Sequence, residues 1–233
     1  MAHTLGLRIV QGEFPEGRTL PTESELCVEL SVSRTALREA MKALAAKGLV
    51  ESRPKTGTRV CERRNWNLLD PDILAWLYTA GLNRDHYDAL SEVRRIVEPA
   101  AARLAARRAS EEDLGKIRRA FQGLCDAGED VEAGIEPDVK FHLSILEAAG
   151  NPFLAPLGAL IRSALAESFR LSSSLPDAQQ RSLQRHGAVL EAIEAGDGAA
   201  AEAAMRTLID HAKDYLAQAL REAEPPPPGQ AGS

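Results

Sequence analysis

The chain has 233 residues, of which 44% are hydrophobic and 27% are charged. This composition is typical of a globular protein, and the length suits one large domain or two small ones. No apolar run approaches the roughly 18 residues of a membrane span, the N-terminal residues lack the layout of a signal peptide, and three widely spaced Cys argue against a disulfide scaffold or a zinc finger. We therefore expect a cytoplasmic protein that does not enter a membrane.

The net charge of −6 is divided unevenly along the chain. Residues 1–64 contain 11 basic and 8 acidic side chains, a net charge of +3, and the remaining residues carry −9. A basic head on an acidic body predicts that the head, and not the body, meets a polyanion.

Two short helices are expected early in the chain, at residues 3–10 and at about 23–30. Thr22 is followed three residues later by Glu25, which is the signature of a capping box. The segment "SVS" then breaks the helical pattern. A third helix should follow directly, and two short helices separated by a tight turn are the layout of a helix-turn-helix.

The third helix is expected to begin after Ser33, a good N-cap, and to end at about Lys47, before Gly48. Its apolar residues fall on one face and its basic residues on another. Those basic residues are Arg34, Arg38 and Lys42. Alone, such a pattern describes any amphipathic surface helix, but behind a capped helix and a turn it indicates a DNA-recognition helix.

Residues 49–64 predict a β-hairpin, or wing, because the β-compatible runs "LVES" and "TRVCE" flank the turn "RPKTG". This segment has five basic residues and two acidic ones. Residues 1–64 are therefore predicted to form a winged helix-turn-helix domain that binds double-stranded DNA.

The rest of the chain is predicted to be all α, so the fold class is mainly α. The segment "NWNLLDPD", residues 65–72, shows no regular period and is interpreted as a linker. Residues 73–223 are expected to form a bundle of six or seven helices that binds an effector and dimerises, and residues 224–233 a disordered tail. The expected helices are at about 72–80, 84–108, 111–126, 137–149, 153–173, 177–195 and 198–222.

In a helix-turn-helix the start of the second helix reaches base edges in the major groove. The side chains expected there are those of Ser33, Arg34, Thr35 and Arg38, with Lys55 on the wing. The arginine fork matches guanine, and threonine meets a phosphate or a thymine methyl group. One helix and one wing touch few bases, so a homodimer on a near-palindromic operator is expected.

Polar residues on the inner faces of the bundle are a second feature. Asp138 and His142 are four residues apart and share one helical face. His186 and His211 lie on or beside apolar stripes of later helices. Imidazole and carboxylate groups inside a bundle suit Zn²⁺ or a similar divalent metal, whereas a single inward His is more often a hydrogen-bonded core residue. A metal site and a metal-free core both remain open.

Arg94 borders an apolar stripe on the helix expected at 84–108. A buried cation is costly unless it is paired. Glu98, one turn later, would provide an intramolecular ion pair. Alternatively, the guanidinium group would clamp the carboxylate of an effector in two-point geometry.

The residues "LPTESELCVELSVSRTALREAMKALAAKGLVESRPKTGTRV", 20–60, resemble the winged-helix domain of GntR-type bacterial transcription regulators. The segments "SEVRRIVEPAAARLAARRAS", "DVKFHLSILEAAGNPFL" and "HGAVLEAIEAGDGAAAEAAM" resemble the FCD-type effector domain of the FadR-like branch, so the resemblance covers nearly the whole chain. Within that branch, "RNWNLLDPDILAW" looks like the linker of galactonate-operon repressors.

The resemblance implies DNA contacts by Arg34, Thr35, Arg38 and the wing residue Gly57. One family contact is an Arg in the preceding helix, where this chain has Ser24, so the resemblance leaves the base preference at that position open. The resemblance also implies that Arg94 matches an Arg used for effector carboxylates.

For the metal, the family pattern is an Asp, a His one turn later and two His from later helices, and Asp138, His142 and His186 match three of these positions. The fourth falls on Leu208, which cannot ligate. His211 would substitute only if its helix shifted. The site is then three-coordinate from protein and completed by water or effector, or it is metal-free.

These observations predict a transcription repressor released from its operator by a small carboxylate, such as a sugar acid of the aldonate type. A metal-dependent enzyme using the Asp/His cluster is the first alternative, but the chain contains no HExxH, nucleophile elbow or phosphate loop, and an enzyme would leave the basic head unexplained. An effector-independent DNA-binding protein is the second alternative, and its helical domain would bind neither ligand nor metal.

Overall fold

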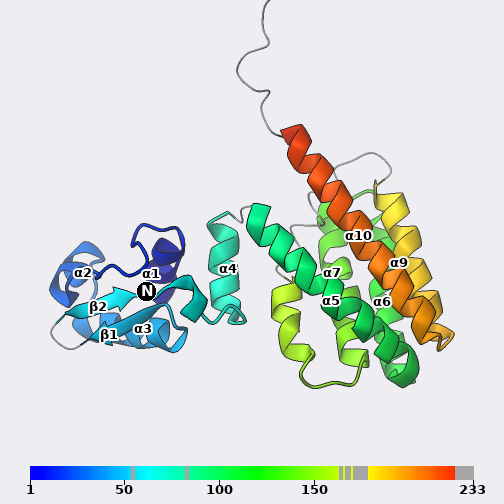
Figure 1. The fold of residues 1–233 in the computed structure, drawn as a ribbon, viewed down its shortest axis with the longest axis horizontal. Helices are drawn as coiled ribbons and strands as arrows, with labels where there is room; N and C mark the ends of the chain where they lie inside the picture. The colour runs from blue at the N-terminus through cyan, green and yellow to red at the C-terminus, as the bar shows by residue number, and fades with distance from the viewer. Residues whose placement is uncertain (54–55, 82–83, 163–164, 166–168, 170–177, 224–233) are drawn as a thin grey trace, which may run out of the picture. The chain divides into compact units, whose positions relative to one another are not determined.

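The computed structural model describes residues 1–53, 56–81, 84–162, 165, 169 and 178–223 (Figure 1). The described chain is mainly helical and divides into two compact units, Met1–Asp85 and His86–Ser233. The expected tail at 224–233 lies outside the described residues. None of the described helices is long and apolar enough to cross a membrane.

The first unit contains the predicted winged helix-turn-helix. Helix α2 packs against α3, α3 packs against α1, and an antiparallel hairpin follows α3. The elements are α1 (Ala2–Val10), α2 (Glu23–Glu29), α3 (Arg34–Ala46), β1 (Val50–Arg53) and β2 (Gly57–Val60). Their buried apolar side chains form one core that includes Leu5, Ile9, Leu26, Leu37, Leu44, Leu49 and Val60.

Local capping places the two helices of the motif. The Thr22 hydroxyl accepts a hydrogen bond from the Glu25 backbone at 3.3 Å, and the Glu25 carboxylate accepts one from the Thr22 backbone at 2.7 Å, so the predicted capping box is present. Ser33 caps α3 by accepting from the Ala36 N–H at 3.2 Å. After α3 the chain turns at Gly48, whose φ of +76° favours glycine.

The hairpin pairs Val50 with Val60 at its base and Arg53 with Gly57 at its tip. Gly57 has a φ of +86°, in the left-handed region that glycine adopts without strain. The short turn is therefore compatible with antiparallel pairing up to the last residue of β1.

Helix α4 (Pro71–Thr79) belongs to the first unit. Trp76 is buried, and its indole N–H donates to His3 Nδ1 on α1 at 2.7 Å. Its ring covers Gly6, where an added Cβ would lie 2.3 Å from the indole Cζ3. The first unit thus extends past the linker expected at 65–72, because the apolar face of α4 is buried against α1.

The second unit is built from long helices that pack mainly as neighbours in sequence, α6 with α7 and α9 with α10 (Figure 1). They are α5 (Arg84–Arg108), α6 (Glu111–Ala127), α7 (Val131–Ala148), α9 (Ala178–Glu194) and α10 (Gly198–Ala223), with a 3-10 turn at Ala155–Leu157. Of the helix expected at 153–173, residues 158–162 are helical, and much of the remainder lies outside the described residues. The main core includes Ile117, Phe141, Ile145, Val189, Ile193 and Met205.

Helix α7 begins six residues earlier than Pro137, where the sequence pattern had suggested its start. Asp130 caps the helix by accepting from the Ala133 N–H at 3.0 Å, which stabilises a first turn ahead of the proline. The Pro137 ring packs on Gly123 of α6, where an added Cβ would lie 3.1 Å from the ring carbons. The missing side chain at Gly123 lets the two helices approach around a proline inside α7.

Candidate functional site

The N-terminal end of α3 presents the residues expected to reach DNA. Ser33, Arg34, Thr35 and Arg38 are all exposed. The Arg38 Nε donates to Glu23 of α2 at 3.1 Å, and 63% of the Arg38 side chain is accessible. An ion pair this exposed contributes little stability and is easily exchanged for a phosphate or a base.

The opposite face of α3 is apolar and buried. Leu37 and Leu44 are fully buried and share a core with Leu26 of α2. The amphipathic pattern of the sequence therefore corresponds to one packed face and one exposed basic face, and the packed face fixes the direction in which Arg34 and Arg38 project.

The wing is less cationic than its composition suggests. Arg53 and Arg59 both pair with Glu51, at 3.0 and 2.7 Å. Gly57 is exposed at the tip, and Lys55 lies outside the described residues. The acidic partner of the two arginines could have been recognised from cross-strand pairing, since Glu51 lies directly opposite Arg59.

In the second unit the structure brings Asp138, His142 and His186 together. One ligand atom from each lies within 4.8 Å of the others, and all three side chains are buried. The Asp138 Oδ1 is 3.0 Å from His186 Nε2 and 3.9 Å from His142 Nε2. Helix α7 supplies the first two residues from one face, and α9 supplies the third.

Hydrogen bonds on the far side of each ring decide which nitrogen faces the cluster. The His186 Nδ1 lies 2.8 Å from the Ser182 carbonyl oxygen, an acceptor only, so Nδ1 carries the proton. The lone pair of Nε2 then points toward the Asp138 carboxylate. Although the two atoms are 3.0 Å apart, Nε2 has no hydrogen-bond partner among the described residues. Two electron-rich atoms this close require a cation or a proton between them.

His142 is oriented in the same way by a carboxylate. Its Nδ1 contacts the carboxylate of Glu98 on α5, a residue that is 1% exposed. With Nδ1–H donating to Glu98, the second nitrogen is free to act as a ligand toward Asp138. A carboxylate behind a metal-ligating imidazole is the usual supporting arrangement. Sequence reasoning considered Glu98 only as a partner of Arg94 and missed this contact, because it joins residues 44 positions apart.

Arg94 forms the intramolecular ion pair, with its Nε donating to Glu98 at 2.6 Å. Burial alone would raise the pKa of Glu98, but the Arg94 guanidinium and His142 lower the pKa to about 2. Burial likewise raises the pKa of Asp138, yet His186, His142 and Arg94 hold that pKa below its usual value. Both buried carboxylates are therefore ionised, and the charge of Arg94 offsets one of them.

A small cavity adjoins this cluster, with a volume of about 30 Å³. It is lined by Arg94, Asp138, His142, Leu165, Phe169, Ser182, His186, Leu208 and Ala212. Leu208, at the position of the fourth family ligand, thus faces the site with an apolar side chain. This volume matches the share of one water molecule and is far below that of a typical ligand pocket.

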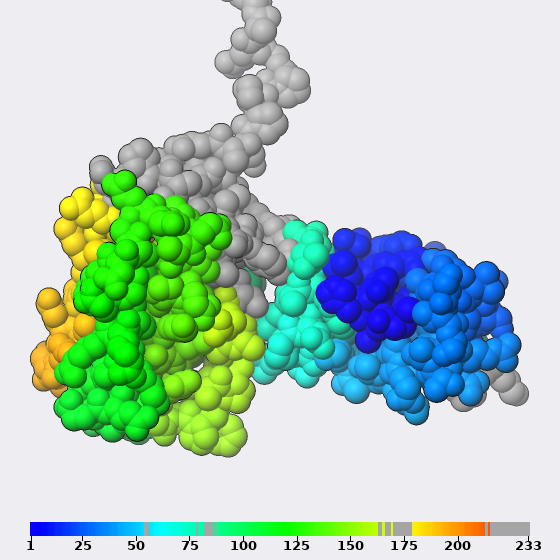
Figure 2. All heavy atoms as spheres, turned by 180° about the vertical axis from the view of Figure 1, so that it is seen from behind, coloured from blue at the N-terminus to red at the C-terminus, as the bar shows by residue number. Residues whose placement is uncertain are grey.

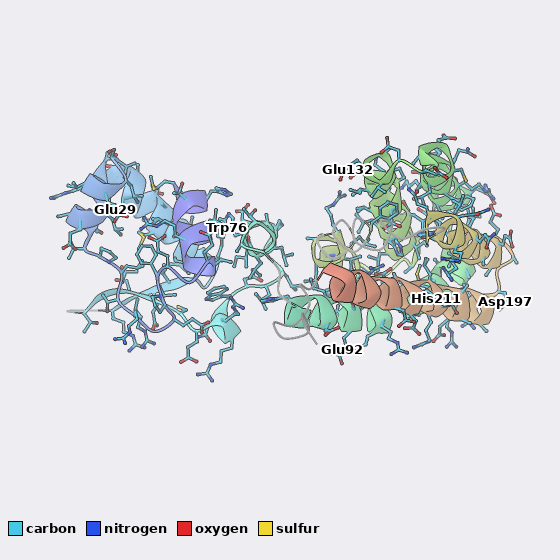
Figure 3. All side chains as sticks on the ribbon, turned by 90° about the horizontal axis from the view of Figure 1, so that it is seen from above. Glu29, Trp76, Glu92, Glu132, Asp197 and His211 are labelled. Carbon is cyan, nitrogen blue, oxygen red and sulfur yellow. The ribbon has the colours of Figure 1, made fainter. Side chains whose placement is uncertain are left out.

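His211 does not belong to the cluster. It lies on α10 with an exposed side chain (Figure 3). The expectation that it points into the bundle is wrong, because Leu208 and Ile209 occupy the buried face of α10.

Two family models match this chain. The gntR family of bacterial regulatory proteins matches residues 2–60, and the FCD domain matches residues 89–211. The galactonate operon transcriptional repressor of Escherichia coli K12 is 39% identical over 207 residues, which cover 88% of this chain and 90% of that protein. The uncharacterized HTH-type transcriptional regulator YieP of the same organism is 36% identical and covers 90% of each chain.

The fold also resembles that of solved regulators. The structure of Lar, which controls the expression of the Listeria monocytogenes agr system, matches with a TM-score of 0.64. The match covers 95% of each chain at 22% sequence identity. The order of a winged head followed by a helical body is therefore shared.

Proposed function

The chain belongs to the gntR family of bacterial regulatory proteins and carries an FCD domain, so it is a DNA-binding transcription regulator, and we propose that it is a repressor released by a small carboxylate. The observation that carries the proposal is the buried cluster of two imidazoles and one carboxylate, placed in the unit that matches the FCD domain. A repressor needs such a second site to sense a ligand.

For the DNA, we propose that Arg34, Thr35 and Arg38 contact base edges and phosphates, with Ser33 holding the start of α3 in place. Support comes from their exposure on one end of a helix whose other face is buried. Gly57 and Lys55 on the wing are proposed to meet the phosphate backbone. One head reads a short half-site, so the working unit is proposed to be a homodimer on a near-palindromic operator.

For the cofactor, we propose a divalent metal, with Zn²⁺ as the first candidate, held by Asp138, His142 and His186. The unprotonated Nε2 atoms and the carboxylate oxygen form a nitrogen and oxygen donor set that suits Zn²⁺. When bound, the metal would offer open coordination positions to oxygen atoms of an effector, because Leu208 cannot fill the fourth position. The metal would also add two positive charges beside two carboxylates, one of which Arg94 already offsets.

For the effector, we propose a sugar acid, with galactonate as the first compound to test. A metal-loaded cluster is net positive once Arg94 is counted with it and so suits a carboxylate, and a relative with 39% identity is named as a galactonate operon repressor. Because the cavity has a volume of only about 30 Å³, binding requires its lining to move apart. That movement is the proposed link between ligand binding and release of DNA.

Calorimetric titration of galactonate into metal-loaded and exhaustively chelated protein tests this scheme. Binding should be lost on chelation, and Arg94→Ala should abolish it while leaving affinity for an operator selected in vitro unchanged. The matched control is Arg95→Ala, which removes an exposed cation from the same helix as Arg94; its partner is Asp210 of α10. Equal ligand affinity with and without metal would remove the metal from the scheme, and a protein blind to all sugar acids would favour effector-independent DNA binding.

A further inference from the structure

The outer side of the α6–α7 pair contains a second, larger cavity with a volume of about 410 Å³. It is lined by Lys116, Arg119, Ala120, Gly123, Pro137, Lys140 and Ser144. This volume lies within the range of small-molecule pockets. The segments of α6 and α7 that form it belong to the green face seen in Figure 2.

Helix geometry explains why a groove exists here. A short turn joins α6 to α7, so the two helices run antiparallel, and Gly123 packs against Pro137 near the turn. Ala120 and Gly123 on α6 have little or no side chain to fill the space between the helices. Lys116, Arg119 and Gly123 repeat at three and four residues, so they line one face of α6.

The lining is cationic although the surrounding domain is acidic. Residues 65–233 carry a net charge of −9, yet the groove has three cations, one hydroxyl group and no carboxylate among its lining residues. Arg119 forms no ion pair with any described residue, and its Nη1 lies near Gly115, one turn earlier on the same helix. The groove therefore presents the charge of Arg119, which has no ion-pair partner among the described residues, beside two lysines in solvent-exposed pairs.

The two lysines are held only loosely. Lys116 is 3.3 Å from Glu112 and 3.8 Å from Asp113, and Lys140 is 3.7 Å from Glu136. The side chains of Glu112 and Glu136 are 80% and 55% exposed, and that of Asp113 is 28% exposed. Exposed pairs of this kind contribute little, so both ammonium groups can turn toward a bound anion. The guanidinium of Arg119 can bind a phosphate or carboxylate through two parallel hydrogen bonds.

From these observations we propose that the α6–α7 groove is a second ligand site, for a small organic anion with two or more negative charges. Phosphate esters and polycarboxylates share that chemistry. The site is separate from the buried cluster, because Pro137, Lys140 and Ser144 line the outer face of α7 whereas Asp138 and His142 occupy its inner face. A ligand in the groove would therefore act on the same helix that supplies two of the proposed metal ligands.

The test is calorimetric titration of the full-length, metal-loaded protein with fructose 1,6-bisphosphate and, separately, with tricarballylate. Saturable binding by one probe or both, at about millimolar concentration or below, is expected, and the arm that binds more tightly identifies the anion class. Arg119→Gln and Lys140→Gln should each weaken binding at least about tenfold. Ser144→Leu, which fills the groove without changing its charge, should also abolish binding.

Arg118→Gln is the matched control, because Arg118 adjoins Arg119 but pairs with Glu194 and does not line the groove. It should leave affinity within about twofold of the original. His186→Ala should also retain binding, which separates this site from the proposed effector site. Absence of saturation up to about 10 mM, equal losses in Arg118→Gln and Arg119→Gln, or loss of binding in His186→Ala would each overturn the proposal.

Discussion

Replacing Glu98 with glutamine should weaken metal binding without touching a proposed ligand. The carboxylate is 1% exposed and has two partners, Arg94 at 2.6 Å and the Nδ1 of His142. The neutral amide keeps one acceptor oxygen but loses its charge, and its NH₂ group cannot accept from either partner. His142 then loses the contact that fixes its tautomer and ring orientation.

The magnitude follows from what such supporting groups contribute. Loss of a supporting carboxylate typically lowers metal affinity by about 10- to 100-fold, which corresponds to about 1.4–2.7 kcal/mol. The folded protein should also be destabilised by about 3–5 kcal/mol, because Arg94 remains buried without its counter-charge. The loss in metal affinity should therefore be accompanied by a clear fall in melting temperature.

Zn²⁺ affinity is measured by competition with a chromophoric chelator, at a temperature where circular dichroism shows that the variant is folded. Glu92→Gln is the control, because Glu92 is an exposed residue of the same helix. The reasoning about His142 would be refuted if Glu98→Gln bound Zn²⁺ as tightly as the original protein while His142→Ala did not bind it.

Three further predictions concern the first unit. Arg34→Ala should cost about 1–3 kcal/mol of affinity for the selected operator and relax the preference for one base, as measured by mobility shift; undiminished selectivity would mean that α3 does not enter the groove as proposed. Gly6→Val should lower the free energy of unfolding by about 1–3 kcal/mol or more, because its Cβ would overlap the Trp76 ring at 2.3 Å; an unchanged denaturant midpoint would contradict the close packing of α1 on α4. Asp70→Asn should destabilise the protein at neutral pH and have a vanishing effect in acid. Burial raises the pKa of Asp70, but the hydrogen bond from Lys47, those from the backbone N–H groups of Asp72 and Ile73, and the Lys47 charge together lower it, so the contribution is present above the unfolded value of about 3.9 and lost as pH falls through the folded value. Unfolding curves that stay separated by the same amount below that range would contradict it.

The helix-turn-helix could be predicted because its signals are local. The capping box at Thr22, the N-cap at Ser33 and the stop at Gly48 each act within a few residues, and the structure contains all three. The apolar face of α3 is likewise a property of one helix. Side chains three and four residues apart must share a face, whatever the rest of the chain does.

The metal cluster could be predicted only in part. Asp138 and His142 are neighbours on one helical face, and His186 lies on an apolar stripe. Because such faces point into the interior of a helical bundle, the three side chains were expected to lie close together. The rotation of α10 about its own axis could not be predicted, because the apolar residues at 208–212 allowed either Leu208 or His211 to face inward. In the structure, contact with the remaining helices leaves Leu208 buried and His211 exposed.

Only the tertiary structure determined the contacts between distant segments. Glu98 supports His142 across 44 residues, Trp76 closes on Gly6 and draws α4 into the first unit, and Gly123 opens a cationic groove beside Pro137. The sequence by itself determined the helices, their caps and their apolar faces, since these depend on interactions within one or two turns. Which helix faces pack together is decided by the whole domain, because the hydrophobic effect favours any apolar contact and is not directional.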